Sequence, residues 1–253
     1  MESMGQETIK LISLNIEMAK HLDLTRAFLE KEKPDVVCMQ EVYEQDLKAF
    51  GKNLGMNAVF GQMNLLGRDN RLEPPFTPYG IGMLSVLSIQ RVHRAYYQGD
   101  EESAKEYVFN GNPQDDHYLL LYGNIKQGSS TFTVGTTHFM WTPHGNPDDF
   151  QRKDLQSLLA ILQGIPEIVL CGDFNAPRGG EIFDTLAQHY KDNIPLEYHT
   201  SIDANLHRDA SKIREKSLMV DGLFTTLAFR CSNVRLVGGV SDHLAIVAEV
   251  RRN

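Results

Sequence analysis

Eight polar side chains capable of catalytic or metal-binding chemistry stand at the ends or breaks of apolar runs. They are Asn15, Glu41, His138, Asp173, Asn175, Asp221, Asp242 and His243. Four of them are carboxylates, and two unit charges about 4 Å apart repel by about 4 kcal/mol at an effective dielectric of about 20. A cluster of these carboxylates would therefore require a bound cation or raised pKa values. Oxygen donors without thiolates favour Mg²⁺, with Mn²⁺ as a substitute, over Zn²⁺.

Residues 168–180 show this arrangement most clearly. Residues 168–171 are apolar on both faces, which predicts a strand buried between two layers. Asp173 and Asn175 follow Gly172, and in an extended chain their side chains would point to the same side. The same pair could instead close an Asx-turn. This motif alone therefore leaves a catalytic centre and a simple turn as alternatives.

Three further apolar runs predict strands that carry one such residue near the end. They are residues 10–17 with Asn15, residues 35–42 with Glu41, and residues 130–139 with His138. Taken singly, each has a structural explanation, because a buried asparagine can close a turn and a histidine at a strand end can be a satisfied structural residue. Their repetition at strand ends favours a shared site.

The C-terminal part of the chain adds the remaining residues. Asp221 interrupts an apolar run at residues 218–224, and burying a carboxylate without a partner is costly. Asp242 and His243 immediately precede a last predicted strand at residues 244–250. We therefore expect Asp221 to have a partner.

The remaining pattern predicts helices and strands around these runs. Apolar spacing indicates helices at residues 21–33, 44–54 and 148–162 and after Gly180, a strand at 80–89, and a hairpin partner at 118–125. Residues 57–76 are interpreted as a surface loop and candidate lid, residues 96–116 as an exposed excursion without a motif, and residues 190–217 as a loop that flanks the site. In the last loop, His199 or His207 could contact substrate, or both could be inert surface residues.

The bulk properties describe a globular chain. It has 253 residues, of which 42% are hydrophobic, and no repeat or linker divides it, so we expect one domain over residues 1–253. No apolar run approaches the roughly 20 residues of a membrane span, and the polar start does not resemble a signal peptide, which predicts a cytoplasmic protein without membrane contact. Cys38, Cys171 and Cys231 lack Cys-x-x-Cys spacing and are interpreted as reduced packing residues. The net charge of −8 argues against a broad basic surface that grips duplex DNA.

Taken in order, the motifs resemble those of the endonuclease/exonuclease/phosphatase superfamily over nearly the whole chain. The matching motifs are Leu14-Asn15-Ile16, Gln40-Glu41-Val42, Thr137-His138-Phe139, Gly172-Asp173-Phe174-Asn175, Val220-Asp221-Gly222-Leu223-Phe224 and Ser241-Asp242-His243. This superfamily includes deoxyribonuclease I, exonuclease III, AP endonucleases, deadenylases, tyrosyl-DNA phosphodiesterase 2, neutral sphingomyelinases and inositol polyphosphate 5-phosphatases. The resemblance implies an α/β (α+β) fold, a four-layer α/β/β/α sandwich of two mainly antiparallel sheets with outer helices. The site would lie at one edge, where the strands end.

The resemblance also implies how the metal and the attacking water are held. Glu41 would be the main ligand of Mg²⁺ or Mn²⁺, with Asn15 and Asp242 beside it, directly or through water. Asp173 would orient and deprotonate the attacking water. Whether one metal or two are bound is left open.

The other residues would act on the phosphate. Asn175 would hold a phosphate oxygen, and His243, aligned by Asp221, would bind and neutralise the phosphate. His138 would contact another oxygen or assist the leaving group. Trp141 could stack on a base or could be a packing residue.

The resulting hypothesis is a Mg²⁺-dependent phosphodiesterase, a nuclease or a DNA- or RNA-end phosphodiesterase. Its partner would be nucleic acid, at a short or single-stranded segment or a strand end, and the protein would be a monomer. The alternatives are a phosphodiesterase or phosphatase for a lipid or small-molecule phosphoester, and a catalytically inactive binding module on the same fold. The sequence leaves the substrate, and endo- versus exonuclease action, undecided.

Overall fold

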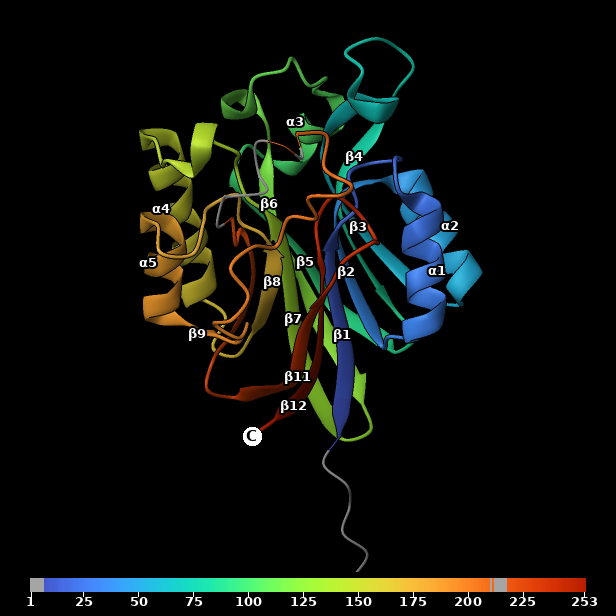
Figure 1. Ribbon diagram of the computed structural model, residues 1–253, viewed down its shortest axis with the longest axis vertical. Helices are drawn as coiled ribbons and strands as arrows, with labels where there is room; N and C mark the ends of the chain where they lie inside the picture. Colours follow the sequence, from blue (N-terminus) through green and yellow to red (C-terminus); the bar gives the residue numbers. More distant parts are fainter. Residues whose placement is uncertain (1–6, 210, 212–217) are drawn as a thin grey trace, which may run out of the picture.

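The computed structural model describes residues 7–209, 211 and 218–253. Two mixed sheets of six strands each pack face to face, and helices cover the outer side of each sheet (Figure 1). This is the α/β/β/α sandwich that the sequence predicted. None of the described helices has the length and apolar composition needed to span a membrane.

The first sheet holds the N-terminal strands and the C-terminal strand. Its order is β11 (Phe229–Val237), β12 (Ala245–Arg252), β1 (Thr8–Asn15), β2 (Val36–Tyr43), β4 (Phe76–Ser85) and β3 (Asn57–Gly67). Helices α1 (Leu22–Glu32) and α2 (Glu44–Leu54) cover its outer face. The β1–β2 pair is parallel, with Asn15 opposite Gln40, and the other neighbours are antiparallel.

The second sheet is built from the middle of the chain. Its order is β5 (Ser88–Gln98), β6 (Tyr118–Gln127), β7 (Ser130–His138), β8 (Val169–Asp173), β10 (Asp221–Thr225) and β9 (Lys191–Asp192). Helices α4 (Asp149–Gln163) and α5 (Glu181–His189) lie outside it (Figure 1). Its one parallel pair, β7–β8, places His138 opposite Asp173.

The central strands are buried on both faces, which explains their continuous apolar runs. In β1, Leu11 packs into the core between the sheets, while Ile12 packs under the outer helices. All five residues of β8 are buried, as the sequence predicted. Below the site, Gln40 donates from Nε2 to Thr136 Oγ1 at 2.8 Å, which joins the two sheets.

Residues 57–67 form strand β3 and not a surface loop. Met63 and Leu66 are buried, and the strand pairs with β4 along its length, with a register break between Gln62 and Asn64. Its polar residues, Asn57, Gln62 and Asn64, and the turn-forming residues that follow it hid the strand pattern; β3 lies at the sheet edge, where only one side has a neighbouring strand. The candidate lid therefore reduces to the single helical turn η1 (Arg68–Asn70) and the following residues 71–75.

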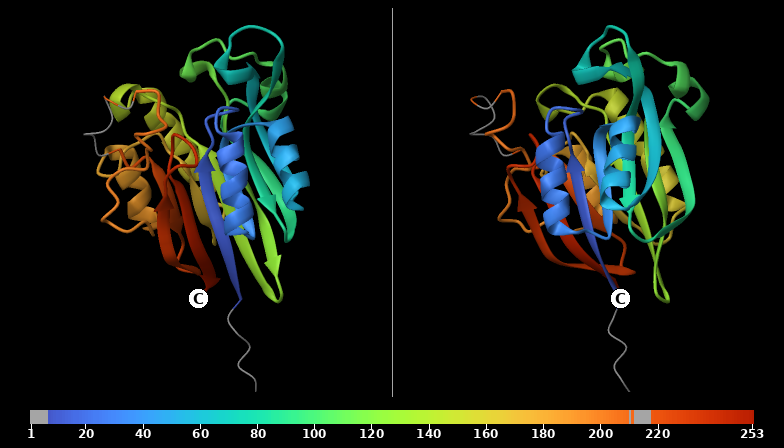
Figure 2. Two further views of the ribbon diagram at one scale, coloured as in Figure 1. Left: turned by 45° about the vertical axis from the view of Figure 1, so that its right-hand side comes forward. Right: turned by 90° about the vertical axis from the view of Figure 1, so that its right-hand side faces the viewer.

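Residues 96–116 also differ from the prediction. They begin with the end of β5, continue through the short helix α3 (Glu101–Glu106) and the turn η2 (Pro113–Asp115), and end at Asp116, which is buried. Figure 2 shows this segment (green) beside residues 68–75 (cyan) at the end of the sandwich away from the C-terminus. The predicted exposed excursion is therefore wrong at Tyr97, Ala104 and Asp116, which are buried.

The loop predicted at residues 190–217 contains the two-residue strand β9 and a bridge between Ile202 and His243. This bridge brings the loop to the predicted site, as expected. Residues 210 and 212–217 lie outside the described part of the chain.

Candidate active site

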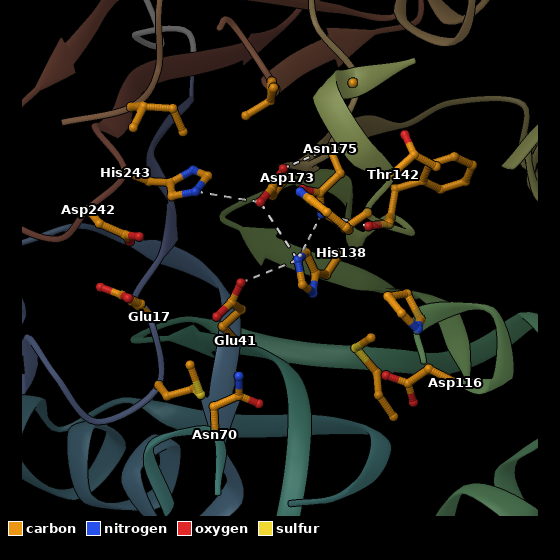
Figure 3. A pocket seen from close by; sticks show the side chains of 18 of the residues that line it. Glu17, Glu41, Asn70, Asp116, His138, Thr142, Asp173, Asn175, Asp242 and His243 are labelled. Carbon is orange, nitrogen blue, oxygen red and sulfur yellow. Dashed lines mark hydrogen bonds and ion pairs between the residues drawn. The ribbon is translucent and has the colours of Figure 1, made fainter. Parts of the chain in front are cut away.

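The predicted site residues meet at one edge of the sandwich. Parallel pairing brings together the ends of β1 and β2 in one sheet and of β7 and β8 in the other. The residues that line a common cavity of about 650 Å³ include Glu41, His138, Asp173, Asn175, Asp242 and His243 (Figure 3). Asn15 and Asp221 stand behind this surface and hydrogen-bond to residues that line it.

Gly172 brings the ends of β7 and β8 close together. Its φ is 149°, and a Cβ atom there would lie 2.1 Å from the backbone oxygen of Thr137. Only glycine avoids this contact. The sequence places a glycine directly before Asp173 because the backbones must approach this closely.

Asp173 lies at the centre of the site and is 1% exposed. Its Oδ1 accepts the backbone N–H of Asn175 at 2.8 Å, and its Oδ2 accepts Nδ2 of Asn15 at 3.0 Å. The same Oδ2 lies 3.7 Å from His138 Nε2 and 3.8 Å from His243 Nε2 (Figure 3). Both of its oxygens are thus fixed by protein donors, and one of them faces two imidazoles.

Asn175 both closes an Asx-turn and lines the site, the two alternatives that the sequence left open. Its backbone closes the Asx interaction with Asp173, and its φ of 49° departs from the extended chain. Its side chain still lines the cavity, where Nδ2 donates to the backbone oxygen of Phe139 at 2.8 Å and lies 3.1 Å from His138 Nε2. A turn and a site residue are therefore compatible at this position.

His243 and Asp221 form a buried carboxylate–imidazole pair across the two sheets. Asp221 Oδ2 lies 2.7 Å from His243 Nδ1, and the Asp221 backbone N–H donates to Ser201 Oγ at 3.1 Å. Burial by itself would lower the pKa of His243, but the charges of Asp221 and Asp173 outweigh it and raise this pKa well above its usual range. These charges favour the protonated form of the imidazole, which lines the cavity and whose Nε2 lies 3.8 Å from Asp173 Oδ2.

Glu41 sits at a β-bulge in β2, where its φ is 53°. Its Oε1 accepts Nδ2 of Asn15 at 3.0 Å and lies 3.6 Å from His138 Nε2. Asn15 therefore donates to both Glu41 and Asp173, and its own Oδ1 accepts the backbone N–H of Glu17 at 3.0 Å. In this arrangement Asn15 positions two carboxylates, and serving as a metal ligand would require its amide to turn.

Asp242 carries the clearest sign of crowded negative charge. Burial raises its pKa to about 7, and the nearby charges of Glu41 and Glu17 add to the rise, while His243 opposes it. Among the described residues, Ser241 is the one side-chain donor to Asp242, at 3.2 Å to Oδ1. A cation at this point would relieve the repulsion.

The donor set fits a divalent cation. Glu41, His138 and Asp173 each offer one ligand atom, and these atoms lie within 4.8 Å of one another. Oε2 of Glu41 and Oδ2 of Asp242 accept no hydrogen bond from any described residue. Carboxylate oxygens with free lone pairs are the ligands that Mg²⁺ and Mn²⁺ prefer.

Several residues that line the cavity were not identified from the sequence as site residues. They are Glu17, Asn64, Tyr79 and Asp116. Glu17 follows Asn15 by two positions and could have been found from that spacing, whereas the others depend on tertiary pairing. Of the two histidines considered in the flanking loop, His207 lines the cavity and His199 does not. Trp141 lies at the rim and is 55% exposed.

Comparison with known proteins agrees with this architecture. The sequence profile described as the Endonuclease/Exonuclease/phosphatase family matches residues 12–243. The chain therefore belongs to the endonuclease/exonuclease/phosphatase family, whose members hydrolyse phosphoesters and generally use a divalent metal. Comparison with curated sequences gives no significant match.

Solved structures share the fold at low sequence identity. The endonuclease/exonuclease/phosphatase from Bacteroides vulgatus is 15% identical with a TM-score of 0.72, over 98% of this chain and 100% of the other. The human Nocturnin catalytic domain with a bound sulfate anion is 15% identical with a TM-score of 0.70, over 98% and 97%. TDP2 from D. rerio complexed with a single-strand DNA product is 13% identical with a TM-score of 0.69, over 97% and 99%.

Proposed function

We propose that this protein is a divalent-metal-dependent phosphodiesterase that uses water as the nucleophile. The observation that carries the proposal is the position of Asp173. Its carboxylate accepts hydrogen bonds from Asn15 and Asn175. Its Oδ2 also lies close to the imidazoles of His138 and His243 at the cavity surface. A fixed carboxylate beside two imidazoles is suited to take a proton from water while a phosphate is bound next to it.

The other residues bind the phosphate in this proposal. His243, kept protonated by Asp221, donates from Nε2 to a phosphate oxygen and balances its charge. Asn175 and His138 lie within hydrogen-bond distance of each other and hold a further oxygen or the leaving group. Each of these groups is fixed before substrate arrives, which reduces the reorganisation needed in the transition state.

In this proposal Glu41 and Asp242, which line the same cavity, would hold the metal, with Asn15 orienting Glu41. When bound, Mg²⁺ or Mn²⁺ would supply Lewis-acid stabilisation of charge on the phosphate oxygens.

As substrate we propose a short or single-stranded segment of nucleic acid, or a strand end. The net charge of −8 disfavours a long duplex footprint. The structural likeness to TDP2, which was solved with a single-strand DNA product, supports this substrate class. The exposed ring of Trp141 lines the cavity and supports the proposal as a surface for stacking a base.

A small phosphoester is the second candidate, and the charges that line the cavity favour it. Among the described lining residues, Arg208 is the single lysine or arginine, whereas six residues are acidic: Glu17, Glu41, Asp116, Asp173, Asp209 and Asp242. A path for several phosphates would need more cations. A substrate with a single phosphate group would not.

A substrate panel with Mg²⁺ tests both candidates. It would contain single-stranded and duplex DNA, abasic DNA, 5′-tyrosyl DNA, poly(A), sphingomyelin and an inositol phosphate. We expect metal-stimulated hydrolysis of a nucleic acid, with a weak salt dependence because few phosphates are neutralised. Hydrolysis of sphingomyelin or the inositol phosphate alone would favour the second candidate, and no turnover of any member would indicate a binding module.

A further inference from the structure

The cavity has a second polar end, on the other side of His138 from Asp173 (Figure 3). It is formed by Asp116, which precedes β6 and is 6% exposed, and by Asn64 of β3, which is 1% exposed. Both residues line the cavity, and neither has a place in the chemistry proposed above. A buried carboxylate that borders a cavity requires an explanation because its desolvation is costly.

The hydrogen bonds at this end leave acceptors without donors. Asn64 Nδ2 donates to both oxygens of Asp116, at 2.9 and 2.8 Å, and the backbone N–H of His117 donates to Oδ1 at 2.8 Å. Asn64 Oδ1 is buried and has no partner among the described residues. Asp116 Oδ2 retains free acceptor capacity, since a carboxylate oxygen accepts two hydrogen bonds. The pair therefore offers hydrogen-bond acceptors that the described protein leaves unfilled.

No described lysine or arginine forms an ion pair with Asp116, so its charge is not neutralised as in a structural salt bridge. Instead, the rings of Tyr79 and Tyr118 line the same cavity beside it. Burial raises the pKa of each phenol well above its usual range, and the charge of Asp116 adds to both rises, after the charge of Glu41 in the case of Tyr79. Unfilled acceptors beside aromatic rings suit a ligand that presents hydroxyl groups on an apolar ring.

We propose that Asp116 and Asn64 form a subsite that binds a hydroxyl-bearing substituent of the phosphoester, such as the sugar of a terminal nucleotide. The proposal rests on the proposed phosphodiesterase function. Hydroxyls of the substituent donate to the Asp116 carboxylate and the Asn64 amide oxygen, while the phosphate occupies the site beyond His138. The subsite selects and orients the substrate and takes no part in bond breaking.

The test compares two chromogenic phosphodiesters that differ in the substituent, thymidine 5′-(p-nitrophenyl) phosphate and methyl p-nitrophenyl phosphate. The variant is Asp116→Asn, which keeps the shape of the side chain. Its matched control is Asp115→Asn, because Asp115 is the exposed neighbour and lies outside the cavity. Both are assayed with Mg²⁺ beside the wild type.

We expect Asp116→Asn to lower kcat/KM for the thymidine ester by about 10- to 100-fold, mainly through KM, because hydrogen bonds to a charged group contribute about 1.5–3 kcal/mol. The kcat/KM of Asp116→Asn for the methyl ester should change by less than about twofold. The control Asp115→Asn should leave kcat/KM unchanged for both esters. Asn64→Ala, which removes the amide acceptor, should show the same selective loss. If either variant lowered kcat/KM equally for both esters, or left kcat/KM unchanged for both, the proposed subsite would be overturned.

A binding measurement separates the subsite from the proposed function. If the wild type hydrolysed neither ester, the phosphodiesterase assignment would fail, and thymidine 5′-monophosphate binding would then decide the subsite. Asp116→Asn should weaken that binding by about 10-fold, and unchanged binding would contradict the subsite. If the wild type hydrolysed glucose 6-phosphate and Asp116→Asn lowered that activity to the same extent, the subsite would be supported. Its ligand would then be the sugar of a sugar phosphate.

Discussion

The carboxylates of the active site fall into two groups that differ in their hydrogen bonds. Asp173 and Asp221 are held firmly, the first by Asn15 and Asn175 and the second by its pair with His243. Glu41 and Asp242 each keep one oxygen that accepts no hydrogen bond from a described residue. Under the proposed function, this difference matches two kinds of chemistry, because the proton acceptor Asp173 requires a fixed orientation and a metal ligand requires free lone pairs.

Asp154 of α4 supplies a contrast outside the cavity. It is buried, its Oδ2 has no hydrogen-bond partner among the described residues, and burial raises its pKa to about 7. It does not line the cavity. A free carboxylate oxygen alone therefore does not define a candidate metal site. Glu41 and Asp242 differ from Asp154 because they line one cavity, where the charge of Glu41 adds to the raised pKa of Asp242.

The largest expected effect follows from changing a firmly held carboxylate. Asp173→Asn preserves the shape of the side chain and removes the proton acceptor, so kcat should fall by about 10²–10⁴-fold. Raising the concentration of Mg²⁺ or Mn²⁺ should not restore the rate, because metal binding is retained. Steady-state kinetics over a range of metal concentrations would measure this, and recovery of the rate would contradict the role of Asp173.

A carboxylate that keeps one oxygen without a hydrogen bond, such as that of Glu41, should respond differently. Glu41→Gln removes one ligand charge, so the apparent metal affinity should fall by about 10-fold or more and the rate should drop at low Mg²⁺. High Mg²⁺ or Mn²⁺ should recover part of the rate. The same metal titration applies, and a rate that stayed low at every metal concentration would place Glu41 among the firmly held, catalytic carboxylates.

The His243–Asp221 pair should show its role in the pH profile. Asp221→Asn removes the main charge that raises the pKa of His243, while burial continues to lower it. His243 should therefore lose its proton at lower pH, and the alkaline limb of the kcat/KM profile should move to lower pH. On that limb, each unit by which the pKa of His243 falls should lower kcat/KM about tenfold. An unchanged profile would show that His243 does not act as a cation.

The smallest effect is expected at Asp154 and concerns stability alone. Because its folded-state pKa is raised to about 7, the protonated form stabilises the fold below the usual carboxyl pKa of about 4, and this contribution is lost as pH rises through about 7. The wild type should therefore lose free energy of unfolding as pH rises from about 4 to about 8, and Asp154→Asn should not. The difference in free energy of unfolding should shift in favour of Asp154→Asn over this range. Denaturant unfolding at several pH values measures it.

Asp149→Asn, an exposed change on the same helix, controls for the altered net charge. A stability difference between Asp154→Asn and the wild type that did not vary with pH would contradict the assignment to a buried, unpartnered carboxyl.

The sequence predicted the strands that position the site because these strands are central and apolar on both faces. β1, β2, β7 and β8 were anticipated as strands, β10 was seen only as an apolar run, and the fold class and family are confirmed. The four edge strands β3, β5, β9 and β11 were missed. An edge strand is partly exposed and tolerates polar residues, so its hydrophobic pattern is weak.

The Asp116–Asn64 pair could not be predicted for a related reason. Its hydrogen bonds join positions 52 residues apart, and they form because edge strand β3 passes beside the segment that precedes β6. In the sequence, Asp116 stands in a polar stretch next to Asp115 and is indistinguishable from a solvated charge. The roles assigned to the site residues themselves stay predictions, since the structure supplies their geometry alone.

The most direct test of the division between the two groups of carboxylates is metal binding without substrate. Isothermal titration of Mn²⁺ into the wild type, Glu41→Gln and Asp173→Asn would measure it. The account predicts that Glu41→Gln binds Mn²⁺ at least about 10-fold more weakly, and that Asp173→Asn binds it within about threefold of the wild type. Weak binding by Asp173→Asn together with unchanged binding by Glu41→Gln would contradict the account.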